Sequence, residues 1–212
     1  MKHSPRKKAR SPQAKPSARH DMKAIMLIGL VTAALLLGAG GFRMLLTAQH
    51  HAEVGGPYAL SDCEGHRVTQ ADFQGRYTVF YFGYTHCIDV CPLALATLSA
   101  ALDRLGPPAN GVVPIFVSVD PDRDTSAVIE QYVTRFSPRI VGLTGTQAQL
   151  KEVLDAFHVT VRKDAVTPSG YLIDHTSVLY VMDGQNHLAG MIPVDDSAEQ
   201  MAVELTRILH RT

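Results

Sequence analysis

The sequence predicts an α/β domain in which helices flank a mixed β-sheet. Two observations predict it. After residue 54, apolar runs rich in β-branched and aromatic residues alternate with amphipathic stretches of helical spacing, which is typical of strands alternating with helices. The chain then closes with two short apolar runs around a tight turn and one more amphipathic stretch, a pattern that adds an antiparallel hairpin and a last helix. With 212 residues the chain is long enough for one domain with a buried core.

Charge is distributed unevenly along the chain. Residues 1–43 contain nine Lys or Arg and one acidic residue, Asp21, whereas residues 44–212 contain 11 basic and 19 acidic residues. Residues 24–42 are 19 consecutive uncharged residues, close to the roughly 20 that a membrane-spanning helix needs. Eight of the nine basic residues precede this segment, so the positive-inside rule puts the N-terminus in the cytoplasm. The basic residues therefore indicate membrane topology and not nucleic-acid binding.

We therefore expect four regions. They are a basic disordered cytoplasmic tail at 1–23, one transmembrane anchor at 24–42, a tether at 43–53 and a folded domain at 54–212. A cleaved signal peptide is the alternative interpretation of the apolar segment, although its hydrophobic region is normally only about 7–15 residues long.

The elements of the folded domain follow from local patterns. Residues 77–82 and 112–119 are continuous apolar runs, as expected of buried strands. The expected strands are 58–60, 67–69, 77–82, 112–119, 141–143, 159–162, 177–182 and 188–192. Helices are expected where leucines or other apolar residues recur at helical spacing, with Pro92 suited to the first helical position and Gly106 ending that helix. The expected helices are 92–105, 125–136, 146–157 and 197–209.

Two cysteines follow the strand at 77–82. Cys87 precedes the next helix, and Cys91 lies four residues on, in its first turn. A helix N-terminus favours negative charge, since its first amide groups lack partners. It therefore favours the thiolate, which is both a nucleophile and a metal ligand. Three intervening residues, one more than in the familiar redox motif, leave room for a disulfide or for two sulfurs on one ion.

The ligand types narrow the choice of metal. Thiolates favour Cu(I), zinc or iron–sulfur clusters. Structural zinc requires four protein ligands, and no further Cys or His stands at paired spacing. An iron–sulfur cluster usually needs four thiolates, and the chain has three cysteines. Two thiolates and one imidazole suit copper best. His175 is the strongest candidate for the imidazole, because it lies just before the expected strand 177–182 in a loop that we expect to face the cysteines. A purely structural role for this histidine is the alternative.

Several segments together resemble the Sco/SenC family of copper-binding assembly proteins. They are residues 55–60, 80–92, 116–124, 141–145 and the pair Asp174-His175. The resemblance covers about residues 54–193 and implies a thioredoxin-like fold on a membrane anchor. It also implies that Cys87, Cys91 and His175 bind copper, as Cu(I) and in some states Cu(II), and that the two cysteines form a redox-active pair able to close as a disulfide.

The same resemblance implies a place and partners. The protein would be a single-pass protein of the inner (cytoplasmic) membrane with its domain in the periplasm, where it matures the binuclear copper centre of cytochrome c oxidase. Expected partners are the copper-site subunit of the oxidase and other copper chaperones or thiol reductants. The chain has Ile88 where the family usually has proline after the first cysteine, and Cys63 is an additional cysteine. We interpret Cys63 as an inert surface thiol, with a second redox partner or an intermolecular disulfide as alternatives.

Other functions remain open from the residues alone. The cysteine pair could serve a thiol–disulfide oxidoreductase, a peroxiredoxin-like thiol peroxidase or a structural disulfide, although a bridge over four residues stabilises little. Asp89 and Asp174 flank the ligands, and each could orient a ligand or cap an element. Three further aspartates are expected to form a turn and cap a helix: Asp120, Asp122 and Asp124.

Overall fold

The computed structural model describes residues 26–27, 30–32, 54–164 and 170–211. The chain separates into two compact units, Met1–Ala52 and Glu53–Thr212. The predicted tail at 1–23 and the tether residues 43–53 lie outside the described residues, as does most of the predicted anchor at 24–42. The five described residues of the anchor are helical. Across the described ranges no helix has both the length and the apolar character needed to cross a membrane.

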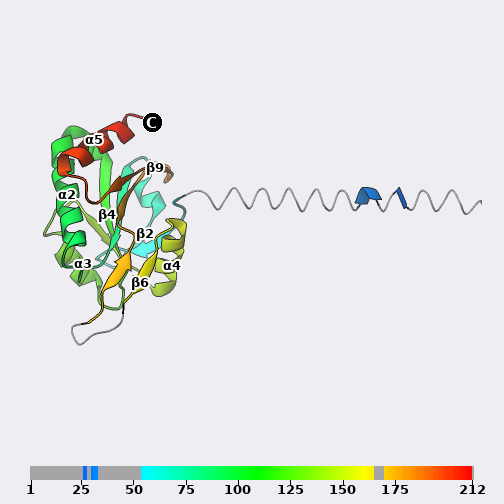
Figure 1. Cartoon of the computed structure of the whole chain (residues 1–212), viewed down its shortest axis with the longest axis horizontal. Helices are drawn as coiled ribbons and strands as arrows, with labels where there is room; N and C mark the ends of the chain where they lie inside the picture. Colours follow the sequence, from blue (N-terminus) through cyan, green and yellow to red (C-terminus); the bar gives the residue numbers. More distant parts are fainter. Residues whose placement is uncertain (1–25, 28–29, 33–53, 165–169, 212) are drawn as a thin grey trace, which may run out of the picture. The chain divides into compact units, whose positions relative to one another are not determined.

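The second unit is built on a five-stranded mixed sheet with the order β5-β4-β3-β8-β9 (Figure 1). The three strands β3, β4 and β5 are parallel, and β8 runs antiparallel to both β3 and β9. The bounds are β3 Tyr77–Gly83, β4 Val112–Ser118, β5 Val141–Leu143, β8 Val178–Met182 and β9 Leu188–Pro193. Two small antiparallel sheets accompany it, β1 Ala59–Ser61 with β2 Arg67–Thr69, and β6 Val161–Lys163 with β7 Ile173–His175.

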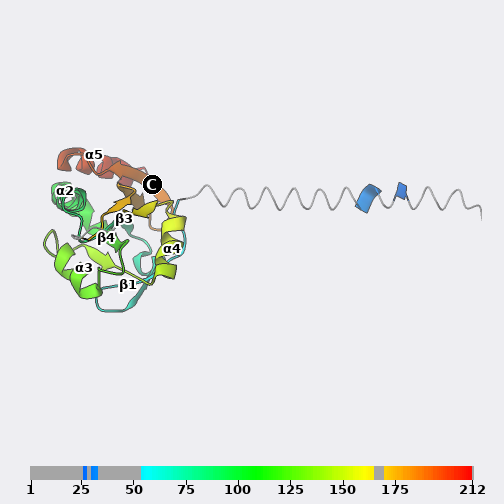
Figure 2. The same ribbon diagram turned by 60° about the horizontal axis from the view of Figure 1, so that its bottom comes forward.

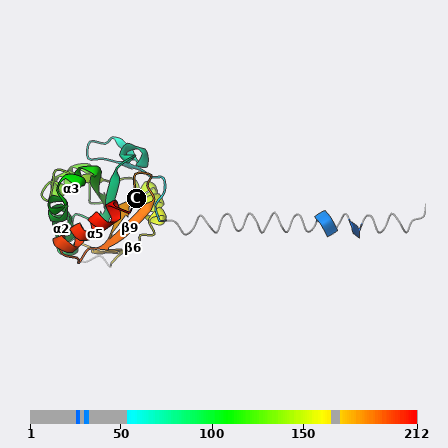
Figure 3. The ribbon, with the colours of Figure 1, turned by 90° about the horizontal axis from the view of Figure 1, so that it is seen from above.

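Helices cover both faces of the sheet. They are α2 Val90–Leu105, α3 Ser126–Val133, α4 Gln147–Ala156 and α5 Ala198–Leu209, with short 3₁₀ turns η1 Gln70–Phe73 and η2 Pro107–Gly111. The helices α2, α3 and α5 lie on one side, and α4 lies on the other (Figures 1 and 2). Seen from above, α5 runs beside α2 and next to β9 (Figure 3). This arrangement confirms the predicted mixed sheet flanked by helices.

The central strand β3 is buried on both faces, which explains its continuous apolar sequence. Phe80 and Phe82 point toward α4, where both rings contact Phe157 at centroid distances of 4.8 and 5.2 Å. Tyr81 and Gly83 alternate to the opposite face, toward α2 and α3. Because burying one such aromatic side chain contributes about 1.5–3 kcal/mol, this strand holds the two helical layers together.

Two boundaries near the cysteines and the histidine differ from the prediction. The helix α2 begins at Val90, so that Pro92 occupies its third position and not its first. Proline is tolerated there because the amide groups of the first turn have no partner within the helix. His175 ends strand β7, where it pairs with Val161, whereas the sequence predicted a loop. Two of the three residues of β7, Asp174 and His175, are polar, so the segment lacks the apolar run that predicted the equally short strand 141–143.

Candidate metal centre

The two cysteines lie where β3 ends and α2 begins. Cys91 is fully buried and Cys87 is half-buried. Both are free thiols, and the backbone N–H of Cys91 donates to Sγ of Cys87 at 3.3 Å. The loop and the first turn of the helix thus present both sulfurs at one place, as the sequence predicted.

His175 joins this pair from strand β7. Its Nε2 lies 3.5 Å from Sγ of Cys91, across 84 residues of sequence. Its Nδ1 lies 3.1 Å from the carbonyl oxygen of Thr176, and because a carbonyl oxygen only accepts, this contact favours the tautomer that leaves Nε2 available to a metal. Tyr81 and Tyr84 pack edge-on against the imidazole ring at 6.1 and 6.0 Å. These contacts orient the ring toward the sulfur of Cys91.

The two thiols differ in charge at neutral pH. The hydrogen bond from the Cys91 thiol, together with the amide groups of Cys91 and Asp89 and the nearby His175, lowers the pKa of Cys87 to about 5 against the effect of burial. The same hydrogen bond, followed by burial, raises the pKa of Cys91. The pair therefore carries one negative charge, on Cys87, and one proton, on Cys91.

Gly83 permits the close approach of α2 to the sheet. A Cβ at this position would lie 2.9 Å from the ring of Phe116 and 3.1 Å from Sγ of Cys91. Any side chain here would push the ligand helix away from β3.

A buried carboxylate fixes the cysteine loop. Asp124, only 1 % exposed, accepts hydrogen bonds from the backbone N–H and the hydroxyl of Thr85 at 2.9 and 2.6 Å, and from the Ser118 hydroxyl at 2.6 Å. The residue that caps α3 is Thr125 and not Asp124. From the sequence, Asp124 was expected only to form the turn and cap a helix, so its anchoring of the cysteine loop was not predicted. A carboxylate just after a buried parallel strand was the available signal, since such strand ends lie at the edge where the neighbouring loop emerges.

A second buried carboxylate holds the segment that leads to His175. Asp120 pairs with the guanidinium of Arg123 and accepts from the hydroxyl of Tyr171 at 2.6 Å. The guanidinium carbon of Arg123 lies 3.6 Å from the ring centroid of Tyr171, and its Nη1 donates to the Tyr171 carbonyl at 3.0 Å. The turn after β4 thus positions both the cysteine loop, through Asp124, and the segment that leads to His175, through Asp120.

The two flanking aspartates do not reach the sulfurs. Asp89 is exposed at the N-cap of α2, and within the described structure its carboxylate makes no capping hydrogen bond. Asp174 points away from the site and pairs with Arg162 at 3.1 Å, with both side chains largely exposed. Asp89 affects the site only through its backbone N–H, whose hydrogen bond to Cys87 helps to lower the pKa of that thiol.

Cys63 has the properties of an unreactive thiol. It is half-buried in the β1–β2 hairpin, and its Sγ lies 3.6 Å from the carbonyl oxygen of Gly142. Burial first, and then the carboxylates of Glu130, Asp62 and Glu64, raise its pKa to about 11. These observations favour the inert interpretation of this cysteine.

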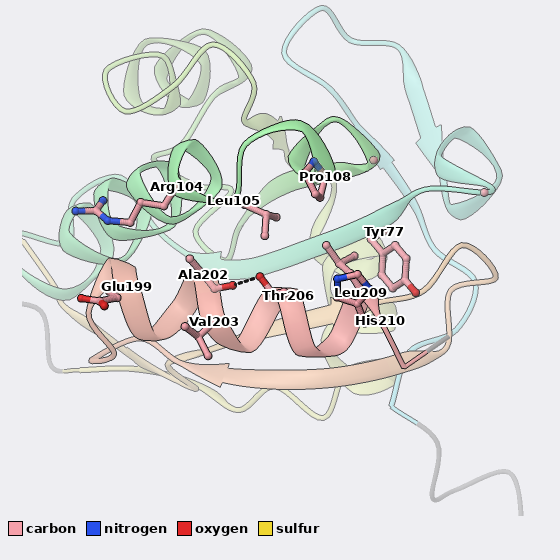
Figure 4. Close-up of a pocket in the computed structure, with 12 residues that line it drawn as sticks. Tyr77, Arg104, Leu105, Pro108, Glu199, Ala202, Val203, Thr206, Leu209 and His210 are labelled. Carbon is pink, nitrogen blue, oxygen red and sulfur yellow. Dashed lines mark hydrogen bonds between the residues drawn. The ribbon is translucent and has the colours of Figure 1, made fainter.

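A large hollow of the described chain lies away from the sulfurs. It has a volume of about 630 Å³, and its lining comes mainly from the end of α2, η2 and α5, without a cysteine (Figure 4). The three candidate ligands, Cys87, Cys91 and His175, do not line this hollow.

The three candidate ligands fit a soft metal ion. One thiolate, one thiol that can lose its proton and one imidazole nitrogen with a free lone pair form a donor set suited to Cu(I). The buried aromatic surroundings limit access of water from the side of the sheet.

Comparison with known proteins identifies relatives of this chain. Residues 46–210 match the SCO1/SenC family model. The chain is 40 % identical over 146 residues to Protein SCO1 homolog 1, mitochondrial, of Arabidopsis thaliana, covering 64 % of this chain and 44 % of that protein. It is 38 % identical over 139 residues to Protein SCO1 homolog, mitochondrial, of Homo sapiens, and the match covers 62 % of this chain and 46 % of that protein. The chain thus spans less than half the length of these two relatives.

Solved structures share the thioredoxin-like fold. The crystal structure of Arabidopsis thaliana ScoI with copper bound has a TM-score of 0.72 at 34 % identity and covers 75 % of this chain and 99 % of that one. The structure of Bradyrhizobium japonicum ScoI with copper bound has a TM-score of 0.67 at 37 % identity, and the match covers 73 % of this chain and 99 % of that one. The family match extends over most of the present sequence. The chain therefore belongs to the SCO1/SenC family.

Proposed function

We propose that this protein is a membrane-anchored copper chaperone that binds one copper ion through Cys87, Cys91 and His175. The observation that carries the proposal is the 3.5 Å approach of His175 Nε2 to the buried sulfur of Cys91. The copper-bound structures of two relatives at 34 % and 37 % identity support it.

The different pKa values of the two thiols determine how the site would load copper. Cys87 is already a thiolate, so Cu(I) binding at neutral pH displaces one proton, from Cys91. Delivery proceeds by ligand exchange, in which a partner thiolate bonds to copper while a ligand of this chain leaves. The partner would be the copper-site subunit of cytochrome c oxidase, and loading would come from another copper chaperone. Ile88 is 90 % exposed beside Cys87 and offers apolar surface to such partners.

The charge distribution of the sequence supports the proposed location. With residues 24–42 as a single-pass anchor in the inner membrane and the N-terminus in the cytoplasm, the domain would lie in the periplasm.

A second candidate function is thiol–disulfide exchange, and the asymmetry of the thiols favours it. The Cys87 thiolate would attack a partner disulfide, forming a mixed disulfide and releasing one partner thiolate. Cys91, after losing its proton, would then attack the sulfur of Cys87, closing the Cys87–Cys91 disulfide and releasing the second partner thiolate. This reaction reduces the partner and leaves a pair that cannot bind copper until it is reduced again. A thiol peroxidase would use the same thiolate but leaves His175 without a role.

Titration of the full-length protein with Cu(I), Cu(II) and Zn(II), in the reduced and oxidised forms, tests the proposal. We expect one Cu(I) to bind the reduced form and none to bind the disulfide form. His175→Ala should weaken Cu(I) binding by at least about tenfold while disulfide exchange persists. His187→Ala, in the exposed hairpin after β8, is the matched control. Unchanged Cu(I) affinity in His175→Ala would contradict the three-ligand site.

A further inference from the structure

Strand β7 has one edge that β6 does not pair. The backbone N–H of Asp164 donates to the Leu172 carbonyl oxygen at 2.9 Å, and that of Thr176 donates to the Thr160 carbonyl oxygen at 3.1 Å. Bonded and non-bonded pairs alternate along an antiparallel ladder. These two bonds, one at each end of β7, therefore leave the N–H of Ile173 pointing away from β6, where it needs an acceptor from another part of the chain.

The acceptor is the hydroxyl of Tyr84, in the cysteine loop. The N–H of Ile173 donates to its Oη at 3.3 Å, across 89 residues of sequence. Tyr84 is 4 % exposed and Ile173 is 5 % exposed, so solvent water has little access to either group. A buried N–H without a partner destabilises a fold. The tyrosine hydroxyl therefore permits β7 to lie against this loop.

Tyr84 contacts both segments that carry candidate ligands. Its ring centroid lies 6.0 Å from that of His175, and the two rings are nearly perpendicular, at 89°. Its carbonyl oxygen accepts from the backbone N–H of Cys87 at 3.3 Å. The guanidinium carbon of Arg123 lies 5.8 Å from its ring centroid. One residue thus joins the loop that carries Cys87 to the strand that carries His175.

We propose that Tyr84 is a positioning residue for the metal centre. Its hydroxyl holds the backbone of Ile173, and with it His175 two residues on, against the cysteine loop. The inference rests on the proposed function, in which His175 is a copper ligand. A buried tyrosine with only a packing role would need its ring and not its hydroxyl. Tyr84→Phe keeps the ring and removes the hydroxyl, so it separates the two roles.

The first test measures the Cu(I) affinity of Tyr84→Phe in the reduced, full-length protein, by anaerobic competition with a Cu(I) chelator of known affinity. Without the hydroxyl, β7 is held less firmly, and the imidazole faces the sulfurs in only a fraction of the molecules. The apparent affinity falls by that fraction. We expect a loss of about three- to tenfold, the range that one neutral hydrogen bond covers. An unchanged affinity overturns the proposal.

Tyr180→Phe is the matched control. Tyr180 lies on β8, is 3 % exposed, and packs against Phe82 and Phe157 on the face of the main sheet that α4 covers. This variant also loses one buried tyrosine hydroxyl, and we expect its Cu(I) affinity to equal that of the unaltered protein. An equal loss in both variants would overturn the assignment to Tyr84.

The second test repeats Tyr84→Phe in the His175→Ala background. Because Tyr84 acts on copper only through the imidazole, the substitution should cause no further loss of Cu(I) affinity once the imidazole is absent. The same loss in both backgrounds would show a general structural effect and overturn the positioning role.

A third measurement needs neither copper nor a variant that folds. In the metal-free, unaltered protein the Ile173 amide should exchange its hydrogen as slowly as the amides of Asp164 and Thr176, which donate to backbone carbonyls. Rapid exchange of Ile173 would contradict the proposed hydrogen bond. In Tyr84→Phe the same amide should exchange about tenfold faster. If the unaltered protein does not bind copper, the proposed function fails, while these exchange rates still decide whether Tyr84 holds β7.

Discussion

At the scale of single residues, the two cysteines four positions apart have opposite properties. Cys87 is half-buried and held as a thiolate by the Cys91 thiol and by backbone amides. Cys91 is fully buried and held protonated by the same hydrogen bond and by burial. The Cys87 sulfur is thus ready to react with a partner. The Cys91 sulfur stays buried until it binds copper or forms a disulfide with Cys87.

The pH dependence of alkylation should show this difference. Iodoacetamide should modify Cys87 with a rate that rises through a midpoint near pH 5 and is flat above about pH 6, because only the thiolate reacts. Cys63, whose pKa is raised to about 11, should react far more slowly at pH 7 and serves as the internal comparison. Mass spectrometry of the modified peptides measures both rates, and a Cys87 midpoint near 9 would contradict the assigned charge.

The lowered pKa of Cys87 also links its charge to folding. The ordinary pKa of a cysteine thiol is 9.0, and the pKa of Cys87 in the folded domain is about 5, so the unfolded chain binds more protons between these values. The contribution of Cys87 to stability is therefore fully present above about pH 9 and is lost as the pH falls through about 5.

At the scale of elements, the site is assembled from segments that lie far apart in the sequence. Cys87 lies in the loop after β3 and Cys91 in the first turn of α2, the turn after β4 carries the buried Asp120 and Asp124, and strand β7 carries the histidine. Asp124 anchors the first loop through Thr85, and Asp120 anchors the third segment through Tyr171. The turn after β4 thus sets the distance between the sulfurs and the imidazole.

Asp124→Asn should separate this anchoring role from simple turn formation. In the variant, the NH₂ of the amide group would face donors of Thr85 and Ser118 that bond to a carboxylate oxygen in the unaltered protein. We therefore expect a loss of about 1–3 kcal/mol in the free energy of unfolding. We also expect weaker Cu(I) binding. Urea denaturation of the metal-free protein measures the first effect. Asp122→Asn in the same turn, at an exposed ion pair with Lys163, is the control and should change stability by less than about 0.5 kcal/mol. Equal losses in both variants would argue against the anchoring role.

At the scale of the whole molecule, copper should stabilise the folded domain. The three ligands converge only in the fold, so an ion that binds them favours the folded state by mass action, by about 2.7 kcal/mol at a free concentration one hundred times Kd. For a domain of this size the melting temperature should rise by about 5–10 °C. Calorimetry of the reduced protein with Cu(I) under anaerobic conditions measures the shift. Cys87→Ser should abolish it, and a full shift in that variant would place the ion elsewhere.

The sequence by itself determined the features that depend on neighbouring residues. The buried run before the cysteines and the leucine spacing after them predicted β3, α2 and the placement of two thiols at a helix N-terminus. Hydrophobic period and turn residues are local, so the main-sheet strands were predicted to within two residues. The short strand β7 was missed because two of its three residues are polar. The start of α2 at Val90 was missed because a proline inside the first turn leaves no periodic signal.

Only the tertiary structure decided how the distant parts of the site meet. It brought His175 to 3.5 Å from a sulfur 84 residues away, paired Asp174 with Arg162 instead of the site, and buried Asp124 beside the cysteine loop. The tertiary structure also decided that Cys87 and Cys91 carry different charges. Burial and hydrogen bonding depend on every segment that packs around a group, and no local pattern in the sequence contains that information.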